Sequence, residues 1–110
     1  MFFNEDRREY ARIATNIDCL LYIDSNEISG KIKNLSENGL LIETNNFSKL
    51  SNIAQLIFMD DNEVINQKIR IVRQDNNKLG CYVHCSINDS FYNYVILKKA
   101  RKFSNRNSTK

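Results

Sequence analysis

The sequence contains no proline, and no hydrophobic run in it is long enough to cross a bilayer. Without proline, nothing interrupts the backbone hydrogen bonding of a strand. The longest apolar stretch, IAQLIFM at residues 53–59, falls far short of the roughly 20 residues that a membrane-spanning helix needs. The N-terminus also lacks the apolar core and the cleavage site of a secretory signal peptide. We therefore expect a cytoplasmic protein that does not insert into membranes.

Cysteine and histidine are scarce as well, which bears on metal binding and catalysis. Cys19, Cys81 and Cys85 form no CxxC pair, and an extended CYVHC segment would point His84 away from the two cysteines beside it. We therefore expect free thiols, no metal and no cofactor. With His84 as the only histidine and no conspicuous carboxylate pair, we expect no enzymatic activity either.

The positive charge is confined to one end of the chain. Residues 98–110 carry six lysines and arginines and no acidic residue, so the net charge of +3 leaves residues 1–97 with a charge of −3. A slightly acidic body lacks the basic face of a general nucleic-acid binder, and we expect no nucleic-acid partner. A small nucleic-acid-binding barrel is an alternative, since VINQKIRIVR contains Lys68, Arg70 and Arg73, but this segment has no aromatic residue to stack on bases. We interpret the basic end as the end of a helix followed by a solvated tail.

Apolar and polar residues alternate along most of the chain, which is typical of strands with one buried face. In IDCLLYID every second residue is apolar and would share one face: Ile17, Cys19, Leu21 and Ile23. Five similar segments follow, EISGKIKN, GLLIET, IAQLIFM, VINQKIRIVRQ and LGCYVHCSI, with the polar turn sequences DSN, SENG, DDNE and DNNK between strands. Short strands with short connections predict an all-β fold, a six-stranded antiparallel barrel. Within SENG, Asn38–Gly39 favours positive φ and a tight hairpin turn.

The last part of the chain has a different pattern. Phe91, Tyr94, Val95 and Leu97 recur at roughly helical spacing, and the basic residues that follow suit the C-terminal end of a helix. A helix is predicted whose apolar stripe covers the open end of the barrel. The expected boundaries are a flexible arginine-bearing leader at 1–13, the barrel at 14–88, the helix at 89–102 and a disordered tail at 103–110, with residues 1–102 forming one domain.

Polar groups gather where one predicted strand ends and the next begins, in KNLSENGLL at residues 33–41. Asn34 and Ser36 are two residues apart, so on an extended backbone their side chains point the same way. Gly39 provides a bend and leaves room for a ligand beside the backbone. These residues predict a polar patch on the barrel rim that can read the edge of a purine.

Three arginines near the N-terminus offer the complementary chemistry. Arg7, Arg8 and Arg12 lie in DRREYARI, ahead of the first predicted strand. A guanidinium group binds phosphate oxygens in a bidentate manner, and its flat face stacks on a base. We expect this segment to fold over a nucleotide held on the polar patch.

Both segments resemble the signature motifs of the PilZ domain family. RREYAR fits the RxxxR motif as Arg8-x-x-x-Arg12, and NLSENG fits the [D/N]xSxxG motif as Asn34-x-Ser36-x-x-Gly39. PilZ domains bind the bacterial second messenger cyclic di-GMP, so the resemblance implies a six-stranded barrel with a C-terminal helix and this ligand. The order and spacing of the motifs along an all-β pattern strengthen the resemblance.

The resemblance also implies a role for each motif residue. The two motif arginines would contact phosphates and guanine faces, Asn34 and Ser36 would bond a guanine edge, and Gly39 would keep the shape of the loop. Arg7 would add a further ligand contact. Asn34 stands where the motif also allows aspartate, so the site lacks a carboxylate that could accept from guanine.

The function predicted from these observations is a cyclic di-GMP receptor or adaptor. With no second domain evident, the signal would pass to a separate, unidentified effector protein through ordering of the N-terminal segment on ligand binding. The alternative is a PilZ-fold interaction adaptor that does not bind nucleotide. We expect a monomer or a weak dimer.

Overall fold

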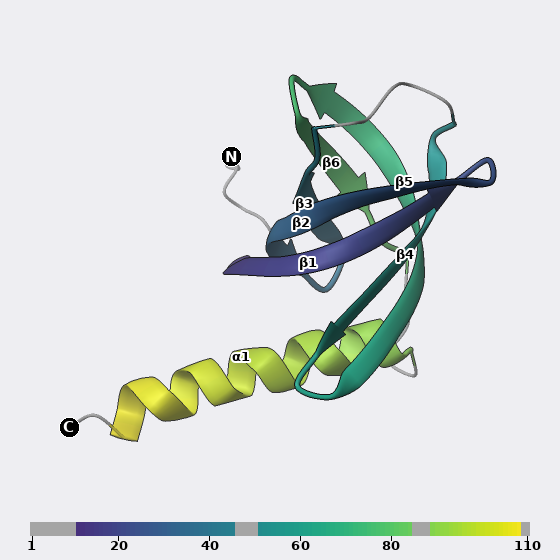
Figure 1. Ribbon diagram of the computed structural model, residues 1–110. Coiled ribbons are helices and arrows are strands. Elements are labelled where there is room, and N and C mark those ends of the chain that lie inside the picture. Colours follow the sequence, from purple (N-terminus) through teal and green to yellow (C-terminus); the bar gives the residue numbers. More distant parts are fainter. Residues whose placement is uncertain (1–10, 46–50, 85–88, 109–110) are drawn as a thin grey trace.

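The computed structural model describes residues 11–45, 51–84 and 89–108, with side chains described as far as residue 101. Within these ranges six antiparallel strands close into a barrel in the order β1-β2-β3-β6-β5-β4, and one helix follows them (Figure 1). The elements are β1 (Ile13–Ile23), β2 (Asn26–Ser36), β3 (Gly39–Glu43), β4 (Ile53–Asp60), β5 (Glu63–Asp75), β6 (Lys78–Tyr82) and α1 (Ser90–Ser108). The predicted barrel with a C-terminal helix is therefore confirmed.

The alternation read from the sequence builds one core inside the barrel. On β1 the predicted inward residues are buried or packed against the core. One buried row runs across five strands through paired positions: Ile13, Leu35, Leu40, Cys81 and Ile71. Because burying one large aliphatic side chain contributes roughly 1.5–3 kcal/mol, such rows supply much of the stability that closes the barrel.

Three of the hairpin turns use left-handed backbone conformations. The residues with positive φ are Asp24, Ser25, Asp61, Asn62 and Asn76. They lie in the turns β1–β2, β4–β5 and β5–β6, where polar residues with short side chains tolerate this conformation best. The polar separators in the sequence therefore act as tight turns.

The turn between β2 and β3 differs from the prediction. Neither Asn38 nor Gly39 has a positive φ. Ser36 pairs with Gly39, so Glu37 and Asn38 form the turn and Gly39 is already the first residue of β3. A Cβ atom at Gly39 would lie 3.1 Å from the carbonyl oxygen of Cys81. Glycine is needed here for the close approach of β3 to β6, not for its freedom in φ.

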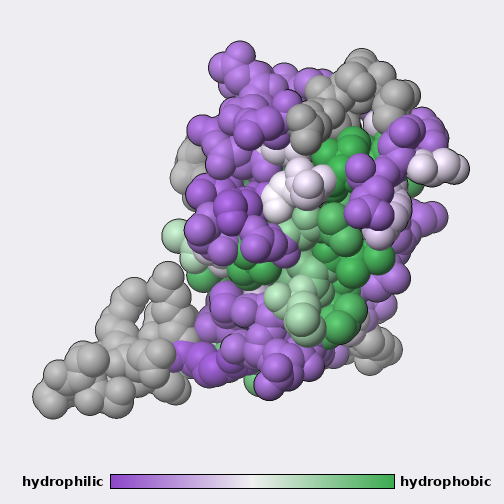
Figure 2. All heavy atoms as spheres, viewed as in Figure 1, coloured by the Kyte–Doolittle hydropathy of each residue, from purple (hydrophilic) through white to green (hydrophobic). Residues whose placement is uncertain are grey.

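The outside of the barrel is not uniformly polar. Met59 and Val64 are cross-strand partners on β4 and β5, and their exposed fractions are 64% and 62%. Together with Leu20 and Ile57 they line a shallow, mostly apolar hollow. Apolar surface also gathers in the middle of the face shown in Figure 2, where β1 and β4 lie toward the viewer.

Helix α1 runs beneath one end of the barrel, past the turn between β4 and β5 (Figure 1). Phe91, Tyr94 and Val95 are fully or almost fully buried and belong to the barrel core. The ring of Tyr94 meets the ring of Phe58 edge to face, with 5.3 Å between the centroids. The predicted cover of the open end by the helix is thus present.

Two details of the predicted helix were wrong. Leu97 is 53% exposed, because the buried stripe passes through positions 91, 94 and 95 and continues to the half-buried position 98, and Leu97 falls outside it. The helix also continues to Ser108, six residues beyond the predicted end at 102, over residues expected to form a disordered tail. Residues 103–108 contain neither glycine nor proline to stop it, and each added residue gains a backbone hydrogen bond.

The basic end of the helix is paired with acidic residues of the barrel. Lys98 Nζ lies 2.8 Å from Asp60 Oδ2, and Arg101 donates to Asp61 in the same turn. Tyr94 also donates a hydrogen bond of 2.6 Å to Asp60. Basic residues that were expected only to suit the C-terminal end of the helix therefore also attach the helix to the β4–β5 turn.

Phe91→Ala should lower the free energy of unfolding by about 3–5 kcal/mol, because it removes a fully buried ring between helix and barrel. Leu97→Ala on the same helix is the matched control and should change it by less than about 0.5 kcal/mol. Urea unfolding followed by circular dichroism measures both. Equal losses in the two variants would contradict this packing.

Asp60 gives the helix contact a pH dependence. Partial burial raises its pKa, but hydrogen bonds from Lys98 and Tyr94 and the charge of Lys98 bring the pKa below its ordinary value of 3.8. A lowered native pKa stabilises the fold above that ordinary value, and the contribution is lost as the pH falls through the native pKa. Asp60→Asn should therefore be less stable at neutral pH and lose less stability in acid. Urea unfolding from about pH 7 to about pH 2 tests this; parallel curves for both proteins would refute it.

Candidate ligand-binding site

The two motif segments meet at the end of the β1–β2 pair. Ile13 pairs with Leu35 and Ala14 with Asn34, so Arg12, one residue before β1, lies beside the end of β2. Arg12 Nη1 donates a hydrogen bond of 3.0 Å to Asn34 Oδ1. Arg12 and Asn34, which are 22 positions apart in the sequence, are thus brought together by the pairing of β1 with β2 and by a direct hydrogen bond.

A β-bulge sets the direction of Asn34. The pairing of β2 with β3 shifts between Ile32 and Asn34, which leaves Lys33 as an extra residue. Ile32 and Leu35 are both fully buried, whereas Asn34 is only partly buried. Simple alternation would have pointed Asn34 inward with Ile32, so the bulge is what places the amide on the outer face.

Ser36 and Gly39 complete the group at the β2–β3 turn. The Ser36 hydroxyl donates to Asn38 Oδ1 at 3.0 Å, and Ser36 is only 1% exposed. A Cβ atom on Gly39 would lie 3.8 Å from Arg12 Nη2 and 3.9 Å from Ser36 Oγ. The hydroxyl therefore supports the turn in this structure, and the guanidinium of Arg12 lies over the glycine.

Four of the six predicted ligand residues are thus brought together: Arg12, Asn34, Ser36 and Gly39. The other two, Arg7 and Arg8, lie outside the described residues. At this end of the barrel the guanidinium group of Arg12 lies against Asn34 and Gly39, while Ser36 is buried beneath the turn.

The sequence did not single out Glu37, which lies within the NLSENG segment. Its carboxylate is buried and accepts hydrogen bonds from Lys99 Nζ at 2.8 and 3.0 Å. A carboxylate this deeply buried needs a paired charge, and the helix supplies it. Since the motif leaves this position open, no sequence signal pointed to it. The turn that carries the site is thus tied to α1.

The two cysteines in the described ranges are buried thiols of raised pKa. Cys19 and Cys81 are free and buried, and burial raises the pKa of each to about 12, with smaller contributions from the charges of Asp18 and Cys19 respectively. Cys85 lies outside the described residues. In the part of the chain that is described, no group of three or more histidine, cysteine or acidic residues is placed to hold a metal ion.

The family of the chain follows from its sequence. The PilZ domain family matches residues 6–91, so the chain belongs to the PilZ family, a family of cyclic di-GMP receptor domains. None of the curated protein sequences matches it.

No helix in the described ranges is both long and apolar enough to span a membrane.

Solved structures of PilZ proteins share the fold. The PilZ domain of CeSA from a cellulose-synthesizing bacterium superposes with a TM-score of 0.63 at 17% identity, covering 86% of this chain and 98% of that one. The Bacillus subtilis inhibitor of motility MotI/DgrA gives 0.67 at 17% identity, covering 90% of this chain and 52% of that one. Escherichia coli YcgR in complex with c-di-GMP gives 0.67 at 15% identity, covering 94% and 50%. The chain therefore spans about half the length of the latter two proteins.

Proposed function

We propose that this chain binds cyclic di-GMP through Arg12, Asn34, Ser36 and Gly39, together with Arg7 and Arg8. The observation that carries the proposal is the hydrogen bond between Arg12 Nη1 and Asn34 Oδ1, because it joins the two motif segments into one site. Membership of the PilZ family supports the choice of ligand.

The contact between Arg12 and Asn34 also supports guanine as the base that the site reads. Arginine carries only donors, so the Asn34 atom that faces it is the carbonyl oxygen. The amide NH₂ group then points away from Arg12. Guanine presents the acceptors O6 and N7 on one edge, which suit an amide NH₂ or a guanidinium group. Adenine presents a donor next to N7, so it would place a donor against a donor.

Arg12→Ala should weaken cyclic di-GMP binding about tenfold or more, because a charge-assisted hydrogen bond contributes roughly 1.5–3 kcal/mol. Titration calorimetry measures it. Arg101→Ala, which removes an exposed arginine that pairs with Asp61, is the control and should bind as the wild type does. Cyclic di-AMP should bind much more weakly than cyclic di-GMP. No heat from the wild-type protein at high cyclic di-GMP concentration would refute the proposal.

A PilZ-fold adaptor that does not bind nucleotide is the second candidate. The observation in its favour is that the Ser36 hydroxyl donates within its own turn, as a purely structural serine would. The same titration separates the two functions.

We further propose that ligand binding orders residues 5–12 and that the ordered segment presents a surface to a separate effector protein. Three arginines within six residues repel one another, and the phosphates of the ligand would cancel that repulsion. If the segment becomes ordered only when the ligand is bound, the effector protein can bind a surface that exists only in the complex.

The amides of residues 5–12 should become protected from hydrogen exchange when cyclic di-GMP is added, while those of the barrel core change little. Deletion of residues 1–12 should abolish binding and leave the barrel folded. Amides that are already protected without ligand, or that stay unprotected in the complex, would refute the ordering mechanism even where binding is real.

A further inference from the structure

The wall of the barrel carries an apolar surface that the described part of the chain leaves uncovered. It is the shallow hollow formed mainly by Leu20, Ile57, Met59 and Val64. Met59 and Val64, which face each other across β4 and β5, are 64% and 62% exposed. Apolar side chains that gather at one place, and are not scattered singly, are typical of a surface that binds another protein.

The outward face of α1 is a second uncovered apolar surface. Ile96 is 39% exposed and Leu97 is 53% exposed, and Ala100 is exposed about one turn further along. Residues 102–108 of the helix extend past the barrel in Figure 1, over about 10 Å at the rise of an α-helix. A helix end that packs against nothing is only marginally stable in water, so a partner on this face would stabilise it.

The borders of the two surfaces carry opposite charge. Asp18 is the one charged residue that lines the hollow, and its side chain is 86% exposed. Glu63, the first residue of β5, is exposed and forms no ion pair within the described ranges. α1 contains no acidic residue, and its last turns contain Lys102 and Arg106. The apolar wall therefore has an acidic border, whereas the apolar helix face leads into a basic end.

Both surfaces lie beside the β4–β5 turn. Met59 comes just before this turn and Val64 just after it. Leu97 is next to Lys98, which pairs with Asp60 in the same turn. This contact attaches the helix at the end of the barrel, so the helix covers the opening of its own barrel and not the wall. In two chains related by a two-fold axis, each helix can lie on the wall of the other chain.

We propose that the hollow on β1, β4 and β5 binds the outward face of α1 of a second copy of this chain, and that the two copies exchange this contact in a two-fold dimer. Leu97 packs against Met59 and Val64, and burial of these side chains supplies the attraction. The charged borders favour helix on wall, because two walls or two helices would bring like charges together. The contact is small, so the dimer is weak.

Sedimentation equilibrium of the whole chain without ligand tests the dimer and does not depend on the proposed function. The weight-average mass should rise from 12.9 kDa toward twice that value between about 10 μM and about 1 mM protein. Salt raised from about 0.05 M to about 0.5 M should weaken the association, because it screens the charged borders. A mass of 12.9 kDa at every concentration, as expected if a different protein or a segment of the same chain covers the hollow, would overturn the proposal.

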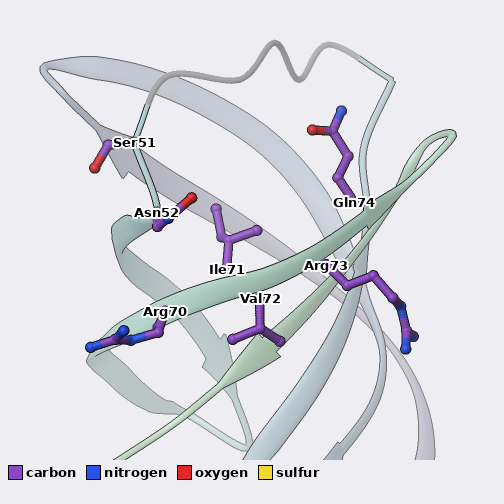
Figure 3. A pocket seen from close by; sticks show the side chains of 7 residues that line it. All are labelled: Ser51, Asn52, Arg70, Ile71, Val72, Arg73 and Gln74. Carbon is purple, nitrogen blue, oxygen red and sulfur yellow. The ribbon is translucent and has the colours of Figure 1, made fainter.

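Two valines of β5 provide a matched pair of variants. Val64→Asp should weaken the association about tenfold or more, because it places a carboxylate in the apolar contact. Val72 has the same exposed fraction of 62%, but it lies near the other end of β5, in a different hollow beside Ser51 and Arg70 (Figure 3). Val72→Asp should stay within about twofold of the wild type, and circular dichroism establishes that both variants are folded. Equal association constants for these two variants would contradict the assigned surface.

A mixture of Val64→Asp and Leu97→Asp chains distinguishes helix on wall from contacts between like surfaces. Each variant alone has one damaged surface in both of its contacts. In a mixed pair, the intact helix of the Val64→Asp chain meets the intact wall of the Leu97→Asp chain, so one contact is whole. A labelled Val64→Asp chain should therefore sediment with excess Leu97→Asp chain more tightly than either variant associates with itself. A mixed pair no tighter than the two variants would mean that like surfaces meet, and the proposal would be wrong.

Discussion

The extra residue in β2 between Ile32 and Asn34 determines what the outer face of this barrel can do. A barrel strand must point every second residue inward, and a one-residue shift would exchange the two faces. The bulge lets Ile32 and Leu35 both enter the core while Asn34 faces outward beside Arg12. The core and the site are therefore fixed by the same irregularity, and neither could move without the other.

The helix depends on the turn that follows this bulge. Glu37 is buried at the tip of the β2–β3 turn, and Lys99 of α1 is its partner. Removing the lysine of such a pair takes away the positive charge that the buried carboxylate faces, which costs more than the intact pair contributes. The turn and the helix thus hold each other in place. A ligand that displaced the turn would disturb Lys99 directly, so the structure contains a physical connection from the site to the helix that covers the barrel.

Much of this arrangement could be predicted from the sequence, because the barrel follows from period-two alternation and polar turns. The two motif segments were also visible as residue patterns, and antiparallel pairing of β1 with β2 brings Arg12 to Asn34. The bulges could not be predicted, since an extra residue in a strand leaves no mark on composition or turn chemistry. For the same reason, alternation could not predict the face of Asn34: it would have placed Asn34 on the inner side together with Ile32, two residues before it.

Other errors came from reading local preferences where tertiary contacts decide. Asn38–Gly39 suggested a positive φ, but the close approach of β3 to Cys81 is what requires glycine. Leu97 was predicted on the apolar stripe from its roughly helical spacing, yet it is 53% exposed, and the half-buried Lys98 beside it reaches Asp60. Contacts of this kind join residues far apart in the sequence, so no local sequence pattern predicts them.

The ion pairs between the helix and the barrel explain the role of the positive charge at the C-terminal end of the chain. Lys98, Lys99 and Arg101 account for half of the basic residues at the C-terminal end, and each is paired with an acidic residue of the barrel. Their charge is used to attach the helix, so it does not form a general basic face for a polyanion. Arg12 and Arg73 lie instead beside glycines of the sheet, Arg12 beside Gly39 and Arg73 beside Gly80. Under the proposed function, short-range complementarity beside Arg12 and Asn34, and not the overall charge of the chain, would select a dinucleotide over a nucleic acid.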